Sequence, residues 1–351
     1  NRDLFSLTVD LTLFDTTLVH FEGKGPQGLA TLSRPGNYPD CVKVLVGLVM
    51  TGDGFPVAHH IFPGNTADIA AFPSDLGDLR RRFSLRRVVI VADRGVVSRD
   101  VIQELEKEKV EYIFGARMRK DKEVASEVLS YPGRYHEVEK NLRVKEVWVG
   151  EHRFIVCRNP EEEERDRKNR EGIVARVREE ISKKGPQAFV MPRVLRRFVK
   201  LVGGEIVLKE KAIEHEARYD GKWVLRTNTN LPASEVALAY KSLWQVEHAF
   251  REIKSGLEIR PVYVRTENHV RGHILVCFLA LVLEAALQRL PKKQGTTVSY
   301  SEVLCDIEQL KAVCFEARGK KWLWRNELPG KAYDAFRAVG MRPPLRVQLL
   351  A

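Results

Sequence analysis

The segment Val88-Val-Ile-Val-Ala92 is short and wholly apolar, and it ends directly at Asp93. A run of this kind is typical of a central, parallel strand that is covered on both faces of its sheet. The carboxyl end of such a strand is where open α/β sheets place their ligands. The segment therefore predicts an α/β fold, with the carboxylate of Asp93 at the functional edge of the sheet.

The residues before this segment predict further strands. Residues 9–13 alternate apolar and polar side chains and lead to Asp15, which this period of two places on the apolar face. An unpaired carboxylate is unfavourable there, whereas Asp10 points to the opposite face. The apolar residues 42–50 and 55–62, separated by a turn sequence, predict a β-hairpin.

Helices and strands then follow in an order that suits a ribonuclease-H-like sheet. Residues 68–83 and 98–109 predict helices, and residues 110–115 predict another strand. In a ribonuclease-H-like sheet the first and fourth strands are parallel neighbours, and neighbouring strands lie about 4.8 Å apart. That pairing would bring Asp15 and Asp93 close enough to bind one metal ion.

Residues 240–254 predict a helix on which a polar stripe runs beside an apolar one. At about 100° per residue, Tyr240, Glu247, Arg251 and Lys254 lie along one line of this helix. The adjacent stripe is apolar and contains Leu243, Val246, Phe250, Ile253 and Leu257. Glu247 thus lies at the edge of the buried face, where a carboxylate flanked by cations suits a metal ion acting on a nucleic-acid backbone. The alternative is an ordinary amphipathic helix with a snorkelling Glu and Lys.

The spacing on this helix resembles the signature of one branch of bacterial insertion-sequence transposases: Tyr, two residues, Arg, three, Glu, six, Lys. This insertion-sequence-four-like branch consists of DDE enzymes with a β-rich insertion. The chain matches at Tyr240, Glu247 and Lys254 and departs at the Arg position, which is Leu243. Other family motifs are resembled by Phe14-Asp15-Thr-Thr, Val91-Ala-Asp93-Arg-Gly, Pro63-Gly-Asn-Thr-Ala-Asp68 and Leu257-Glu-Ile-Arg260-Pro-Val-Tyr263. Together these segments cover most of residues 8–290.

The resemblance implies a catalytic role for three carboxylates. Asp15, Asp93 and Glu247 would be the catalytic residues and the ligands of two Mg²⁺ or Mn²⁺ ions, the hard cations that in-line phosphoryl transfer uses. Without the resemblance, an Asp at the end of a strand is more simply a cap or turn residue. The implied substrate is double-stranded DNA, at transposon ends and target, bound by a homodimer.

The resemblance also implies which residues hold DNA. Tyr240 and Lys254 would bind the DNA end by stacking or by phosphate contact. Leu243 suits the apolar stripe but cannot bind phosphate in place of the signature Arg. Arg251, one helical turn after Glu247, is a candidate substitute for that cation, the alternative being a plain surface arginine.

The sequence pattern changes between residues 118 and 222. Short β-like runs at 143–149, 153–156, 204–208 and 212–216 flank a charged block at 161–184, which predicts a solvated helix. We expect a catalytic domain in two parts, residues 1–117 and 223–290. A β-rich insertion at 118–222 would interrupt it, and residues 291–351 would form a C-terminal extension with a helix at 301–314.

Composition permits a DNA partner. The 351 residues carry 58 basic and 47 acidic side chains, giving a net charge of +11 and a pI near 9.4. A basic surplus favours a polyanionic partner without proving one. The five cysteines form no CxxC pair and lie in apolar stretches, which predicts reduced core thiols in a reducing compartment.

No signal peptide or long apolar span is predicted. The strongest candidate, residues 274–283, meets Glu284 after ten residues, which predicts a buried helix too short to cross a bilayer. We expect a cytoplasmic, nucleoid-associated protein with no membrane partner. The chain begins at Asn1, close to the first predicted catalytic strand. The N-terminal DNA-binding region that family members usually carry is therefore expected to be missing.

Motifs for other chemistries are missing from the sequence. It contains no HExxH, GxSxG, P-loop or GxGxxG pattern, which argues against a zinc enzyme, a hydrolase or a nucleotide site. Asp68 is most simply a helix cap, and Asp220-Gly221 is a turn signal. Two alternatives to a transposase remain: a ribonuclease-H-like nuclease without strand transfer, and a decayed remnant that binds DNA without catalysis.

Overall fold

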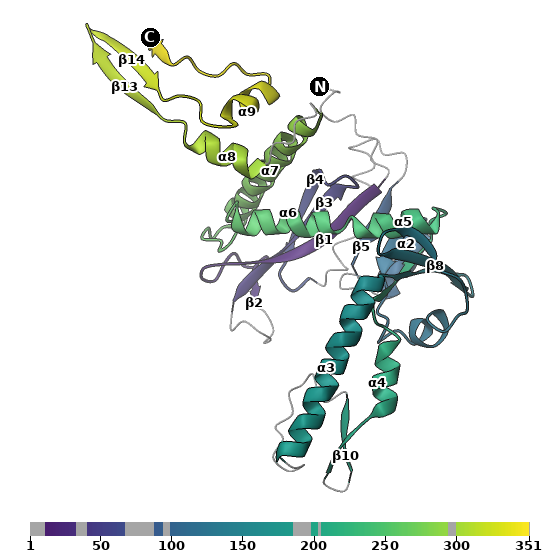
Figure 1. Cartoon of the computed structure of the whole chain (residues 1–351). Coiled ribbons are helices and arrows are strands. Elements are labelled where there is room, and N and C mark those ends of the chain that lie inside the picture. Colours follow the sequence, from purple (N-terminus) through teal and green to yellow (C-terminus); the bar gives the residue numbers. More distant parts are fainter. Residues whose placement is uncertain are drawn as a thin grey trace. The chain divides into compact units, whose positions relative to one another are not determined.

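The computed structural model describes residues 11–32, 41–66, 88–93, 99–184, 198–202, 205–293 and 300–350 (Figure 1). The chain divides into two compact units. Unit 1 contains Asn1–Thr17, Leu45–Gly52 and Asn65–Glu247, and unit 2 contains Leu18–Val44, Asp53–Gly64 and His248–Ala351. Asp10, Asp68 and the helix predicted at 68–83 lie outside the described residues.

A large mixed sheet forms the centre of unit 1, and its strands that reach into this unit have the order β3-β1-β5-β6-β12-β9-β8-β7. Its strands are β1 (Leu11–His20), β3 (Val42–Thr51), β5 (Val89–Ala92), β6 (Glu111–Gly115), β7 (His136–Glu139), β8 (Leu142–Val149), β9 (His152–Arg158) and β12 (Lys222–Thr227). Helices and strands together make this an α/β fold, as predicted.

Strand β5 is the most buried strand of this sheet, and all four of its residues are buried. It pairs in parallel with β1, where Leu13 lies opposite Val91, and in parallel with β6 on its other edge. Helix α5 (Ala233–Lys241) packs against β5 and β6, and α2 (Arg99–Lys107) packs against β6. The predicted parallel pairing of the first strand with the strand before Asp93 is therefore confirmed.

Strands from the predicted insertion continue the same sheet. β12 pairs antiparallel with both β6 and β9, and β8 pairs antiparallel with β9. The π-helix η1 (Val124–Val128) packs on β8. A core cluster joins these elements and contains Met118, Val124, Val128, Val147, Phe154, Val156, Tyr219 and Val224. The boundaries of an insertion at 118–222 stay a prediction.

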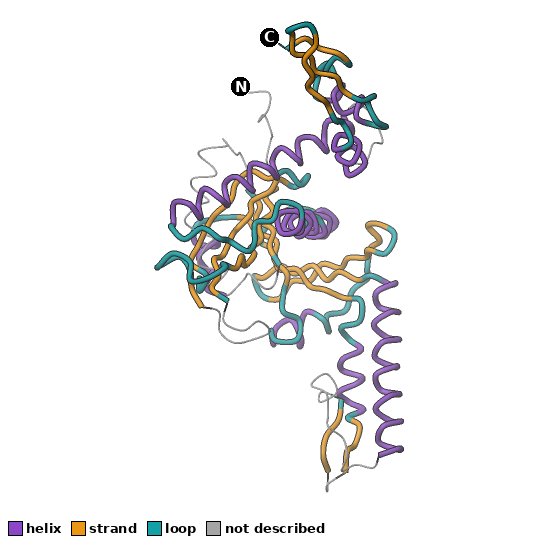
Figure 2. The backbone as a smooth tube through the Cα atoms, turned by 90° about the vertical axis from the view of Figure 1, so that its left-hand side faces the viewer, coloured by secondary structure: helices purple, strands orange, loops and turns teal. Residues whose placement is uncertain are grey.

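Two helices and a small hairpin complete this part of unit 1 (Figure 2). The charged block forms helix α3 (Pro160–Lys184), as predicted, and β10 (Val199–Val202) pairs antiparallel with β11 (Glu205–Leu208). The strand predicted at residues 212–216 is wrong, because this segment lies in helix α4 (Glu210–Ala217). Its Glu, Lys and Ala residues are strong helix formers, and that propensity decides between two short alternatives.

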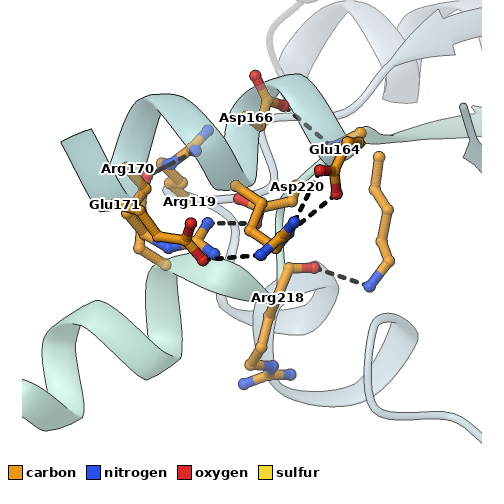
Figure 3. Close-up of polar contacts among 11 residues, drawn as sticks. Arg119, Glu164, Asp166, Arg170, Glu171, Arg218 and Asp220 are labelled. Atoms are coloured by element: carbon orange, nitrogen blue, oxygen red, sulfur yellow. Dashed lines mark hydrogen bonds and ion pairs between the residues drawn. The ribbon is translucent and has the colours of Figure 1, made fainter. Parts of the chain in front are cut away.

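Polar contacts bind α3 to the start of β12, as Figure 3 shows. Arg170 forms an ion pair with Asp220, and both side chains are nearly buried. The amide of Gly221 donates to Asp166 of α3 at 3.0 Å. Gly221 adopts a φ of +57°, and a Cβ there would lie 2.4 Å from the backbone nitrogen of Glu163. The predicted turn at Asp220-Gly221 is therefore confirmed, and only glycine fits its second position.

Unit 2 is built from the remaining described elements. They are β2 (Thr31–Leu32), β4 (Pro56–Pro63), α7 (Glu267–Lys293), α8 (Tyr300–Glu308), β13 (Ala312–Ala317), β14 (Lys320–Arg325), α9 (Ala332–Ala338) and β15 (Val347–Leu349). Helix α6 (Trp244–Ser255) begins in unit 1 and ends in unit 2. The strands predicted at 42–50 and 55–62 are found as β3 and β4.

Helix α7 is longer and more exposed than the sequence predicted. The stretch Glu267–Arg289 has 23 residues, and its most apolar 18-residue window has a mean hydropathy of 2.0 and is 28% buried. The expectations of a short apolar run and of a buried helix at 274–283 are therefore wrong. Helix α7 continues past Glu284, whose carboxylate accepts a hydrogen bond from Gln288 Nε2 at 3.2 Å within the helix. By length and composition alone the stretch could cross a membrane, a test that core helices of soluble proteins also pass.

The C-terminal extension also differs from its prediction. The helix predicted at 301–314 ends at Glu308, and Cys314 lies in strand β13 of a three-stranded sheet with order β13-β14-β15. Cys305 and Cys314 are exposed, so the prediction of five core thiols is wrong for these two, whereas Cys157 and Cys277 are buried. Val313 and Phe315, which are β-branched and aromatic, favour a strand over a helix here.

One face of this C-terminal sheet is apolar. Residues directly opposite on paired strands share a face. Val313 therefore shares a face with Trp324 and Val347, and Phe315 shares it with Trp322 and Leu349. Val313 is 58% exposed, Phe315 44% and Trp324 48%. In the described part of the chain these three side chains are exposed, whereas Trp322 is half-buried.

Candidate active site

Asp15 and Asp93 are placed by the parallel pairing of β1 and β5. The register sets Leu13 opposite Val91, so two residues further along each strand Asp15 and Asp93 follow in step. β1 continues beyond Asp15 to His20, so Asp15 lies inside its strand, whereas Asp93 follows directly after β5. The backbone amide of Thr16 donates to Asp15 Oδ1 at 2.8 Å. Both carboxylates are thereby fixed to adjacent strands of a buried sheet.

The helix predicted over residues 240–254 is interrupted, which corrects the single polar stripe drawn from the sequence. α5 ends at Lys241 and α6 begins at Trp244, and Figure 1 shows the two helices in succession. At the junction the amide of Leu243 donates to the carbonyl of Tyr240 at 3.1 Å, three residues back instead of four. The Ser242 hydroxyl also donates to the carbonyl of Leu238. Such local hydrogen bonds tighten the backbone into a turn.

Glu247 lies in the first turn of α6 and is exposed beside a buried apolar face. Val246 is fully buried, and Phe250 and Ile253 are buried too. The side-chain amide of Gln245 donates to the carbonyl of Gly52 at 3.1 Å, which attaches the start of α6 to the end of β3. The prediction that Glu247 lies at the edge of the buried face is therefore confirmed.

Tyr240 contacts a catalytic candidate directly. Its hydroxyl donates a hydrogen bond to Asp93 Oδ1 at 2.7 Å. A hydrogen bond to a carboxylate is among the stronger neutral–charged contacts and restricts the rotation of the side chain. The sequence predicted Tyr240 as a DNA-binding residue. In the structure its hydroxyl also orients the carboxylate of Asp93.

One pocket of about 520 Å³ brings the candidates together. Asp15, Asp93 and Glu247 all line it, together with Tyr240 and Leu243. The remaining lining residues were not identified from the sequence: Lys140, Asn141, Leu142, Asn159, Trp223, Lys241 and Trp244. The two-residue turn Lys140-Asn141, between strands that alternate apolar and polar residues, is the signal that could have found the first of these.

The donor atoms of this pocket suit a hard divalent cation. Three carboxylates supply only oxygen ligands, which are what Mg²⁺ and Mn²⁺ prefer. Among the residues that the structure describes, no three His, Cys, Asp or Glu side chains are already grouped to hold a metal ion. Asp93 is engaged by Tyr240, and Asp15 accepts from the amide of Thr16. Two bound ions therefore stay a prediction that the chemistry of the lining supports.

The other two predicted DNA-binding residues lie outside this pocket. Arg251 and Lys254 are on α6 beyond Glu247 and are not among the pocket-lining residues. Arg251 is exposed, and the ammonium of Lys254 lies 5.7 Å from the centre of the Phe250 ring. Both side chains follow Glu247 along the helix, one and two turns further on.

Comparison with known proteins gives a family for this arrangement. No curated protein matches the sequence. The structure is similar to a piggyBac transposase in a synaptic complex with hairpin DNA, at 10% identity and a TM-score of 0.44, over 86% of this chain and 52% of that one. It is also similar to the Mos1 transposase in a paired-end complex with the left transposon end, at 18% identity and a TM-score of 0.22, over 32% and 37% of the two chains.

The chain spans about half the length of the piggyBac protein, 52%. The sequence itself matches the model of a protein family described as the transposase DDE domain, over residues 10–283. Because that match covers most of the chain, and both strand carboxylates and the Glu247 helix lie inside it, the protein belongs to the transposase DDE domain family.

Proposed function

We propose that this chain is the catalytic region of a DNA transposase, which cleaves DNA strands at element ends and joins the resulting 3′-hydroxyl to target DNA. The observation that carries the proposal is that Asp15, Asp93 and Glu247, far apart in the sequence, line one pocket. Family membership supports the same assignment. The finer assignment, to the insertion-sequence-four-like branch with a β-rich insertion in a ribonuclease-H-like domain, rests on Tyr240, Glu247 and Lys254.

The proposed roles follow from the chemistry of each side chain. Asp15, Asp93 and Glu247 would hold two Mg²⁺ or Mn²⁺ ions, which when bound supply Lewis acidity to a phosphoryl centre. The Tyr240 hydroxyl keeps Asp93 in one orientation through its 2.7 Å hydrogen bond. Lys254 would contact a phosphate of the DNA backbone as a point charge, which positions DNA without reading its sequence.

We propose that the protein acts on double-stranded DNA as a homodimer, at the nucleoid. The net charge of +11 favours the polyanion. The face of β13–β15 that holds Val313, Phe315 and Trp324 is mainly apolar, with Lys320 at its hairpin end, and an exposed contiguous apolar patch is typical of a protein interface. A second copy is the proposed occupant, because two such faces can stack as paired sheets about 10 Å apart.

The decisive experiment is DNA cleavage by matched carboxylate variants. We expect Glu247→Gln and Asp93→Asn to lower the cleavage rate at least about 1,000-fold in Mg²⁺ or Mn²⁺, because each removes a metal ligand. Duplex binding and the thermal midpoint should change little, since both side chains are polar and line an open pocket. Glu316→Gln, on exposed strand β13, is the control and should cleave like wild type.

The same assay separates the proposal from its rivals. A joined product in which the 3′-hydroxyl is linked to target DNA supports a transposase. Cleavage without any joined product would favour a nuclease of the same fold. Cleavage that persists in Glu247→Gln would refute the proposed site.

A further inference from the structure

The pocket lacks the cation that the family signature places between Tyr240 and Glu247. Leu243 occupies that position, lines the pocket and is 9% exposed. Three carboxylates also line the pocket, so a DNA phosphate brought there meets negative charge. The ions proposed for these carboxylates would offset that charge, and a side-chain cation that contacts phosphate would have to come from another part of the chain.

The tip of the β7–β8 hairpin reaches this pocket from another side. Glu139 pairs with Leu142, which leaves Lys140 and Asn141 as a two-residue turn. Asn141 has a φ of +71°, a conformation that Asn tolerates better than most residues. The turn therefore has a defined backbone, and Lys140 projects from its first position among the residues that line the pocket.

An ion pair holds the hairpin tip to the helix that leads to Leu243. The Lys241 ammonium donates to Glu139 Oε2 at 2.6 Å. Glu139 directly precedes Lys140, and Lys241 lies two residues before Leu243. Helix α5 also packs against β8. The ion pair between Glu139 and Lys241 therefore joins the hairpin tip to the helix end that leads to Leu243, the position of the missing cation.

Lys140 is the lining cation best placed to meet a phosphate. Two cations line the pocket, and the charge of Lys241 is already matched by Glu139. Lys140 is exposed and has no ion pair or side-chain hydrogen bond among the described residues. Arg251, the substitute considered from the sequence, does not line the pocket.

We propose that Lys140 supplies the phosphate contact that Leu243 cannot make, and so positions the DNA strand beside Asp15, Asp93 and Glu247. The inference rests on the proposed function, and it assigns the hairpin tip to the DNA-binding surface. Lys140 acts as a positioning residue. Because a point charge on phosphate carries no base information, its contribution is equal for all sequences.

Salt-dependent binding of a short random-sequence duplex tests this contact. Lys140→Ala should weaken binding roughly tenfold at low salt and lower the log–log salt slope by about one, because one phosphate contact is lost. Lys140→Arg should bind like wild type. Lys120→Ala removes another exposed turn lysine that does not line the pocket, and Arg251→Ala tests the alternative cation. Both should retain more of the wild-type slope than Lys140→Ala does.

A rescue variant makes the test specific to the missing cation. Adding Leu243→Arg to Lys140→Ala restores a cation to the signature position and should recover most of the lost affinity and slope. Wild-type binding and slope in Lys140→Ala would overturn the proposal. So would an unchanged DNA slope combined with altered Mn²⁺ binding, since Lys140 would then be a counter-ion of the carboxylates.

Cleavage is measured separately, so that the two proposals can fail independently. If Lys140→Ala loses affinity and slope while no variant, wild type included, cleaves DNA, the phosphate contact stands and the proposed catalysis fails. If wild type cleaves and Lys140→Ala binds and cleaves equally well, the catalysis stands and the phosphate contact fails.

Discussion

Apolar strands are buried in the central sheet and exposed in the C-terminal sheet. In β5 all four residues are buried, and helix α5 packs against the strand. In β13 all six residues are exposed, although Val313 and Phe315 are as apolar as the residues of β5. Burial is therefore decided by what covers a strand as well as by its composition.

This difference separates two tasks within one chain. The central sheet fixes the backbone at Asp15 and Asp93. The pairing of β1 with β5 therefore holds the two carboxylates in register, and no direct contact between them is required. The uncovered sheet presents an apolar face that can be buried only by something beyond its own strands. Catalytic geometry and association are thus proposed for different sheets, and substitutions in the two sheets should have different readouts.

The largest expected difference between the two sheets is in stability. Ile90→Ala removes a fully buried side chain of β5 and should lower the free energy of unfolding by about 2–4 kcal/mol, because it leaves a cavity. Val313→Ala, at 58% exposure in β13, should lower it by less than about 0.5 kcal/mol. Urea denaturation of both variants, at protein concentrations below those at which the chain dimerises, measures this. Equal losses there would show that the β13 face is already covered within one chain.

Association is the next effect in size. Trp324→Ser in the apolar face should raise the dimer dissociation constant about tenfold or more, since large aromatic side chains dominate interface energies. Light scattering across a concentration series gives the oligomeric state. Trp148→Ser, which changes an exposed tryptophan of β8, is the control. An unaltered dimer in Trp324→Ser, or a monomeric wild type, would contradict the proposed interface.

The smallest effect concerns the pH dependence of stability. Burial of Glu284 in α7, with the Glu252 carboxylate nearby, raises the pKa of its side chain, while His248 and Gln288 act in the opposite direction. A carboxyl whose pKa is raised by folding stabilises the fold below its unfolded pKa, and that contribution is lost as pH rises through the folded pKa. Glu284→Gln should therefore raise the thermal midpoint by roughly 1–2 °C near neutral pH.

The exposed carboxylate of Glu316 on β13 is the control for Glu284. The gain from Glu284→Gln should vanish at about pH 3, where the wild-type carboxyl is protonated in both states. Glu316→Gln on β13 should leave the midpoint unchanged at both pH values. A gain from Glu284→Gln that is equal at the two pH values would show that charge is not its cause.

Much of the central sheet could be predicted from the sequence because its signals are local. The apolar run ending at Asp93 and the period of two before Asp15 each depend on neighbouring residues alone, and the structure pairs the two strands in parallel. Helix α3 was predictable from its charged composition, whereas α4 was too short for its helix-forming residues to be recognised among strands.

The pocket could be predicted only in part, because half of its lining comes from long-range packing. Asp15, Asp93 and Glu247 each have a local motif, but Lys140, Asn159 and Trp223 reach the pocket through strands that join the sheet far along the chain. The break after Lys241 depends on hydrogen bonds made by Ser242 and Leu243, and helical periodicity does not reveal it. The exposed side of α7 was missed because composition does not tell which face is covered.

The tight turn between α5 and α6 determines how this region can accept insertions and deletions. In a continuous helix, one added residue rotates everything beyond it by about 100°. At the turn around Ser242, the backbone between the two helices can absorb part of such a rotation. A turn that can absorb rotation therefore lies between Tyr240 and Glu247. Glu247 and Lys254 lie on one continuous helix, and the helical repeat fixes their relative direction. An insertion or deletion should be tolerated between Tyr240 and Glu247. Between Glu247 and Lys254 it should rotate Lys254 away from the helix face that holds Glu247.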